Sequence, residues 1–121
     1  MEKDVPELKI AKKTLDYIAK NEVDSLYNLL SGNFFERTSQ EDLDLLLVKG
    51  KQVINTNEYP NDSLITVSRT EVKTPGGNVE IKEFEFPFGH SNPDSTMTIK
   101  VEVNNQKISR IYIGYGMRII N

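Results

Sequence analysis

The spacing of apolar residues along this chain changes once, between residues 55 and 64. Before that point, apolar residues recur at every third or fourth position, which is the repeat of an amphipathic helix. After it, apolar and polar residues alternate, which is the repeat of a half-buried strand. Helices followed by strands, without alternation between the two, predict an α+β fold in which N-terminal helices pack on a curved antiparallel sheet.

Three helices are predicted in the first half of the chain. The first covers residues 6–20, because Pro6 suits a first helical turn and an apolar stripe follows, formed by Leu8, Ala11, Leu15, Ile18 and Ala19. The polar residues Asn21 and Glu22 interrupt it, and Asn21 with Asp24 resembles a capping pair for a short second helix. We expect that helix to end at Gly32 as a left-handed cap.

A third helix is expected to start at Ser39. Before it, Phe34 and Phe35 are expected to anchor a connecting segment. Ser39 and Asp42 form a Ser-x-x-Asp capping box, which indicates the start of a helix. Its apolar side contains Leu43, Leu46 and Leu47, which Gln52-Val53-Ile54 can continue, and Gly50 is expected near its end.

The second half of the chain predicts four antiparallel strands in two hairpins. They are expected at Leu64–Lys73, Val79–Phe88, Thr96–Val103 and Lys107–Tyr115. Pro75-Gly76 suits a type II turn in the first hairpin, and Asn104-Asn105 suits a two-residue turn in the second. Gly114 and Gly116 predict a bulge or bend, and further apolar residues are expected to extend the last strand, namely Met117, Ile119 and Ile120.

Length and composition exclude several classes of protein. A chain of 121 residues, 37% hydrophobic and 27% charged, is expected to fold as a single domain, residues 1–121. Cysteine is absent, which excludes disulfides, thiolate metal sites and cysteine nucleophiles. The formal net charge of −3 and the lack of a basic face argue against nucleic-acid binding.

Membrane and export signals are also missing from the sequence. The longest apolar run, Leu45–Val48, is far too short to span a membrane. No apolar stretch follows Met1, so the sequence contains no secretory leader. We expect either a cytoplasmic protein or an exported one whose leader is not part of this sequence.

Few residues offer obvious chemistry. The single histidine, His90, lies in a turn-rich loop, and it is either a solvated loop residue or a base that titrates near neutral pH. The acidic residues Glu41, Asp42 and Asp44 cluster at a helix start, where carboxylates offset the helix dipole, and they lack the pattern of a calcium loop. The glycine pair Gly76-Gly77 is not a phosphate-binding loop, because the Gly-Lys-Ser/Thr motif of such loops does not follow it. We therefore expect no metal and no cofactor.

The order of elements along this chain resembles that of a known superfamily, and residues in the first half carry the resemblance. A long helix, the break at Asn21-Glu22, a second helix ending in Leu29-Leu30-Ser31 and the aromatic pair Phe34-Phe35 follow one another, and Ser39–Leu43 starts a further helix. This layout resembles the nuclear transport factor 2-like (cystatin-like α+β cone) superfamily, and in particular its uncharacterised bacterial branches. The resemblance covers nearly the whole chain. It implies a cone-shaped fold with a pocket between sheet and helices, often a homodimer, and no single activity.

One branch of that superfamily is enzymatic. Ketosteroid-isomerase-like members place a tyrosine on the first long helix and pair it with an Asp base and a protonated Asp. The resemblance puts Tyr17 at the tyrosine position. The segment that would supply the base has no Asp, and only Glu36 stands there, beside Arg37. A small isomerase or hydrolase that uses Tyr17 with Glu36 remains an alternative.

The leading interpretation is a non-catalytic binding domain, because no nucleophile–base pair and no cofactor fingerprint appear in the sequence. Its concave sheet and pocket are expected to bind a protein partner or a small apolar ligand. The residues expected to line the cone are Tyr17, Tyr27, Phe84, Phe86, Tyr112 and Tyr115. The alternation of Phe84 and Phe86 with Phe88 also fits a sheet face that simply packs on helices.

Two further expectations concern partners. A bacterial immunity protein, which neutralises a toxin through the acidic helix face at Glu41–Asp44, is a third alternative. A homodimer, as the resemblance implies, is expected to use Ile111 and Ile113, or Ile119 and Ile120.

Overall fold

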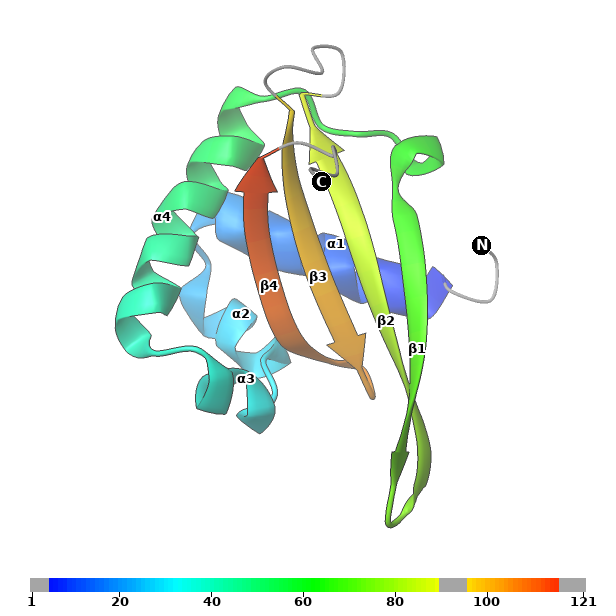
Figure 1. Cartoon of the computed structure of the whole chain (residues 1–121). Coiled ribbons are helices and arrows are strands. Elements are labelled where there is room, and N and C mark those ends of the chain that lie inside the picture. Colours follow the sequence, from blue (N-terminus) through cyan, green and yellow to red (C-terminus); the bar gives the residue numbers. More distant parts are fainter. Residues whose placement is uncertain (1–4, 90–95, 116–121) are drawn as a thin grey trace.

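The computed structural model describes residues 5–89 and 96–115 and confirms the α+β class (Figure 1). The elements are α1 (Val5–Lys20), α2 (Val23–Leu29), α3 (Gly32–Arg37), α4 (Gln40–Thr56), the short 3-10 helix η2 (Asp62–Leu64), β1 (Thr66–Thr74), β2 (Gly77–Phe88), β3 (Met97–Asn104) and β4 (Lys107–Tyr115). The strands form one antiparallel sheet in the order β1-β2-β3-β4. The first helix, α1, packs on β2 and β3, and α4 packs on α1 and β4, so one face of the sheet is covered.

The junction of α1 and α2 is a Schellman motif. Asn21 has a φ of 59°, and its N–H donates to the carbonyl of Ile18 over 3.2 Å. The N–H of Glu22 donates to the carbonyl of Tyr17 over 2.8 Å, which completes the pattern. The predicted capping pair of Asn21 with Asp24 is wrong, because Asn21 ends α1 and Glu22 is the N-cap of α2.

Residues 32–37, expected to form a connecting segment, form the helix α3 instead. Its N-cap is Ser31, whose hydroxyl accepts a hydrogen bond from the N–H of Phe34 at 3.2 Å. Gly32 begins this helix without a positive φ, so the predicted left-handed cap is wrong. The N–H of Ser31 donates to the carbonyl of Ile108 over 2.9 Å, beside a parallel bridge between Leu30 and Ile108. These contacts attach the helical half of the chain to β4.

Helix α4 ends at Thr56, beyond Gly50, near which its end was expected, and it includes Gln52-Val53-Ile54. Its start follows the prediction, because the Ser39 hydroxyl accepts a hydrogen bond from the Asp42 N–H at 3.1 Å. Gly50 is buried in mid-helix, where a Cβ would lie 3.0 Å from Cγ2 of Ile18 and 3.4 Å from Cδ1 of Ile113. The glycine therefore lets α4 approach both α1 and β4 closely, and it does not end the helix.

Both hairpin turns differ from the predictions. In the first, the positive φ of 120° falls on Gly77 and not on Gly76, so the predicted type II geometry is wrong. In the second, Asn105 and Gln106 have φ values of 54° and 64°, as a type I′ turn requires. The turn therefore starts one residue later than predicted, since Asn104 still belongs to β3.

The irregularity in β4 lies earlier than predicted. The β3–β4 register shifts between Glu102 and Val103, opposite Ser109, whereas Gly114 keeps regular pairing. Ser109 is buried, and its hydroxyl donates to Oε1 of Glu102 at 2.7 Å. The bulge predicted at Gly114 is therefore wrong. Other residues named in the sequence predictions lie outside the described part of the chain: His90, Gly116, Met117, Ile119 and Ile120.

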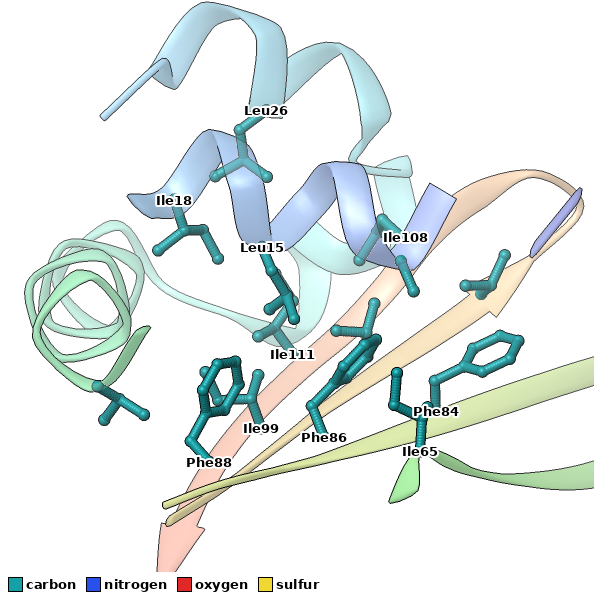
Figure 2. Packing of buried hydrophobic residues seen from close by; sticks show 14 of the residues in the cluster. Leu15, Ile18, Leu26, Ile65, Phe84, Phe86, Phe88, Ile99, Ile108 and Ile111 are labelled. Atoms are coloured by element: carbon teal, nitrogen blue, oxygen red, sulfur yellow. The ribbon is translucent and has the colours of Figure 1, made fainter. Parts of the chain in front are cut away.

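The core lies between the sheet and α1 (Figure 2). Phe84, Phe86 and Phe88 alternate along β2, and all three are fully buried. Full burial of such a side chain stabilises the fold by about 1.5–3 kcal/mol. The same cluster contains, from the other elements, Leu15, Ile18, Leu26, Leu43, Ile99, Val101, Ile108 and Ile111. The aromatic stripe thus fills the helix-covered face of the sheet.

The β1–β2 hairpin extends beyond the rest of the sheet. Strand β2 pairs with β3 only from Ile81 onward, whereas β1 and β2 pair as far as Thr74 and Gly77. Residues 71–80 therefore form a two-stranded extension, called the β1–β2 ribbon below, and Figure 1 shows it projecting from the body of the domain. All of its residues are exposed except Val79, which is half-buried.

Candidate functional site

The phenylalanine residues expected to line a binding cavity are part of the core. Phe84 and Phe86 are 0% exposed and are enclosed by side chains from α1, β3 and β4 (Figure 2). Of the two interpretations of this stripe, complete burial supports core packing. Tyr112 lies on the uncovered face of the sheet, 49% exposed, with the Lys100 ammonium 5.8 Å from its ring centroid. Tyr112 therefore does not face the helices.

Tyr17 and Tyr27 lie half-buried on different helices. The hydroxyl of Tyr27 accepts a hydrogen bond from Nε2 of Gln40 at 3.4 Å. Tyr17 packs against the core. Within the described residues no hydrogen bond joins Tyr17 to Glu36, which is exposed on α3. The isomerase alternative therefore has no formed tyrosine–acid pair, and the side chain of Tyr115 lies outside the described part of the chain.

The isoleucines expected to form a dimer contact on β4 point toward the helices. Ile111 is 8% exposed, and Ile113 is half-buried close to Gly50. Both belong to the helix-covered side, so the predicted contact through Ile111 and Ile113 is wrong. The other pair, Ile119 and Ile120, lies outside the described residues.

A groove of about 560 Å³ lies where α1 and α4 meet. Its floor is apolar and consists of Leu15, Ala19 and Ile54. Its border is polar, formed by Lys12, Lys13, Asp16, Asn55 and Tyr59. All of these residues except Tyr59 lie on α1 or α4, so the packing of these two helices sets most of the shape of the groove.

A second groove of about 480 Å³ continues along α4 and is lined by Asn21, Leu47, Val48, Lys51, Gln52 and Asn55. Asn55 lines both grooves, and its Nδ2 donates to the carbonyl of Ala19 at 3.2 Å. We call the two together the α1–α4 trough. Val48, which lines the trough, is 71% exposed, and apolar surface continues from it to Leu45, which is 64% exposed.

Cations outnumber anions along the α1–α4 trough. Of the residues that line it, Lys12, Lys13 and Lys51 are basic, and only Asp16 is acidic. Lys12 pairs with Asp62, and Asp16 also has an ion-pair partner. Lys13 and Lys51 form no ion pair with any described residue, so their charges can act on a bound anion.

Tyr59 lines the trough just after the end of α4. Its ring meets the buried Phe88 ring edge-on, with 5.1 Å between centroids and 87° between planes. Burial raises the pKa of the Tyr59 phenol above its ordinary 10.0, and the negative charges of Asp16 and Asp62 raise it further. The phenol is therefore a neutral hydrogen-bond donor at physiological pH.

A separate polar pocket of about 470 Å³ lies at the root of the β1–β2 ribbon, where Glu7, Glu80 and Lys82 contribute to its lining. Nζ of Lys82 lies 3.1 Å from Oε1 of Glu7 and 3.7 Å from Oε1 of Glu80. Lys82 is only 12% exposed, so this arrangement serves to attach α1 to β2.

The acidic residues behind the immunity-protein alternative are exposed at the start of α4, namely Glu41, Asp42 and Asp44. Nothing tests that alternative, and it stays a prediction.

In the described part of the chain, no group of three or more His, Asp or Glu side chains is placed to hold a metal ion. No helix described here has both the length and the apolar character to cross a membrane. Comparisons with family models, curated proteins and solved structures found no match to this chain.

The residues of the α1–α4 trough were not among those predicted to form the site. One signal in the sequence points toward it, the apolar run Leu45–Val48. Successive helical residues are rotated by about 100°, so four apolar residues in a row cannot all face the core. Leu45 and Val48 are the two that remain exposed.

Proposed function

We propose that this chain is a non-catalytic interaction domain that binds an acidic amphipathic segment of a partner protein in the α1–α4 trough. The observation that carries this proposal is the trough itself, in which an apolar floor is bordered by the ammonium groups of Lys13 and Lys51, which form no ion pair with a described residue. Covering an apolar floor releases about 25 cal/mol per Å². The lysines select for acidic partners, because complementary charge favours encounter and disfavours basic segments.

The surroundings of the trough favour a protein segment over a small apolar ligand. Val48 in the trough and Leu45 beside it both project from α4 and are largely exposed. A small ligand gains most from an enclosed pocket, whereas an amphipathic helix laid along α4 also covers these side chains. The aromatic stripe that was expected to hold an apolar ligand is instead fully buried.

The architecture itself is, in this proposal, a variant of the nuclear transport factor 2-like cone. Support comes from the long α1, the polar break at Asn21-Glu22, the short α2 and the antiparallel sheet that follows the helices. The chain departs from the expected layout where residues 32–37 form α3. The superfamily hosts many activities, so the proposed function rests on the trough and not on the architecture.

Model peptides test the proposal, since the natural partner is unidentified. Three helical peptides share one apolar face and carry an acidic, a basic or an uncharged polar face. Each is titrated into isotope-labelled protein while amide shifts are followed by NMR. We expect the acidic peptide to shift the amides of residues 12–19 and 47–59, and the basic peptide to leave them in place.

Charge reversals provide the matched comparison. Lys13→Glu and Lys51→Glu are each expected to weaken binding of the acidic peptide about tenfold, the effect of about 1.4 kcal/mol. Arg110→Glu makes the same charge change at an exposed position on the uncovered face of the sheet, and it should leave binding unchanged. Equal binding of acidic and basic peptides, or no shift along the trough with any peptide, would refute the proposal.

A further inference from the structure

Strand β1 is an edge strand with an uncovered outer side. It stands first in the sheet order, and no strand within residues 5–89 or 96–115 pairs with that side. Its nine residues exceed the usual strand length of about 5–6 residues. All of them are exposed except the half-buried Val67. A long row of unpaired N–H and C=O groups is a template for another strand.

Much of β1 belongs to the β1–β2 ribbon, which has little packing of its own. Val72 lies opposite Val79 within the ribbon and is still 38% exposed. A two-stranded ribbon is only marginally stable in water, whereas a third strand makes it a sheet. A strand added to the outer side of β1 would supply that support.

The charges of β1 are complementary to those of a second copy of the same strand. Arg69, Glu71 and Lys73 alternate along one face of β1. When two copies run antiparallel about a two-fold axis at Thr70, Arg69 of each copy lies opposite Glu71 of the other. Opposite charges placed in this way stabilise a strand pair, and the two-fold symmetry repeats the contact.

Other two-fold registers are less favourable. An axis at Arg69 or at Glu71 places like charges directly opposite each other, which is destabilising. An axis at Val72 also joins opposite charges, but it overlaps the strand only over residues 70–74. The axis at Thr70 pairs β1 over its full length, Thr66–Thr74.

We infer that β1 pairs antiparallel with β1 of a second copy of this chain about a two-fold axis at Thr70. The two sheets then form one continuous sheet, and each ribbon gains a third strand from the other copy. This surface lies on β1 and shares no residue with the α1–α4 trough. Dimerisation through β1 and peptide binding in the trough can therefore be tested separately.

Single cysteines test the register, because the chain has no cysteine of its own. Thr70→Cys puts two thiols on the axis, where facing Cα atoms lie about 4.5–5.5 Å apart and a disulfide can form. Ser68→Cys is the matched control, since it is exposed on the same strand face, but its two copies lie roughly 13 Å apart along the strands. We expect mild oxidation to give a covalent dimer only with Thr70→Cys. No dimer at that position, or equal yields from both variants, would overturn the inference.

Charge reversals test how much the Arg69–Glu71 contacts contribute to dimerisation. The dimer affinity is obtained from the molar mass, measured by light scattering over a concentration series. Arg69→Glu and Glu71→Arg each place like charges opposite each other twice, and each is expected to weaken dimerisation about tenfold or more. The double variant, which carries both Arg69→Glu and Glu71→Arg, again places opposite charges across the dimer contact. We expect it to dimerise with wild-type affinity. Arg110→Glu, away from β1, is the control. A wild-type chain that stays monomeric into the millimolar range, or a double variant as weak as the single ones, would contradict the inference.

Discussion

Tyr59 joins the buried Phe88 to the surface of the proposed binding site. Its ring packs edge-on against Phe88, yet 45% of the residue remains exposed along the α1–α4 trough. Asp16 and Asp62 oppose ionisation of its hydroxyl. The same side chain therefore links stability of the fold to pH.

We expect the folded state to lose stability above about pH 10 through Tyr59. The folded-state pKa of its phenol lies above 10.0, the value for the unfolded chain. Below pH 10 the Tyr59 phenol keeps its proton in both the folded and the unfolded state. At higher pH the unfolded chain loses this proton first, because its pKa is lower. The free energy of unfolding therefore falls with rising pH until the pH exceeds the folded-state pKa. Urea denaturation between about pH 9 and pH 11 measures this slope. Tyr59→Phe should flatten it, and identical slopes for the two proteins would contradict the prediction.

Strand β2 gives its two faces opposite environments. Phe84 and Phe86 are fully buried toward α1, while Glu83 and Glu85 on the other face are only half-buried. Two aromatic residues expected at the same site, Phe86 and Tyr112, thus lie on opposite faces of one sheet. Stability measurements distinguish their roles.

Phe86→Ala is expected to lower the free energy of unfolding by about 3–5 kcal/mol, because it leaves a cavity in a fully packed core. Tyr112→Ala is expected to cost less than about 1 kcal/mol, since that side chain is 49% exposed. Urea denaturation of both variants checks this. A small loss for Phe86→Ala would instead indicate that Phe86 borders an open cavity.

The elements of this chain were predictable where periodicity alone decides them. The apolar stripe of α1, the capping box at Ser39 and the alternation along β2 and β3 all predict the observed structure. Residues 32–37 were missed because Gly32 next to a polar Asn favours a helix end, whereas the Ser31 side chain caps a new helix. The shift opposite Ser109 left no signal in the sequence.

The candidate site was less predictable than the fold. Alternating aromatic residues such as Phe84 and Phe86 look alike in sequence whether they fill a core or line a cavity. The α1–α4 trough unites residues as distant in sequence as Lys13 and Lys51. Only the close approach of the two helices, which Gly50 permits, brings these residues to one surface.

The whole molecule consists of a well-packed body and a projecting ribbon. The body contains the core cluster on β2, β3 and β4, and the β1–β2 ribbon contributes nothing to that cluster. Local stability is therefore expected to differ strongly along single strands.

Hydrogen exchange measured on the Arg69→Glu variant, which we expect to be monomeric, should reveal this difference. Amides of Ile99 and Val101 in the central strand β3 are expected to exchange roughly a hundredfold more slowly than those of residues 71–80. In the wild-type protein at high concentration, the ribbon should gain protection. Uniform protection of ribbon and body in the variant would contradict the prediction.

The parallel bridge between Leu30 and Ile108 has a consequence for how the protein is made. During translation at roughly 5–20 residues per second, the helices leave the ribosome several seconds before β4 does. Until then the apolar faces of α1 and α4 have no sheet to cover them. The apolar faces of the nascent helical half therefore stay exposed until β4 has left the ribosome, which makes aggregation during synthesis more favourable.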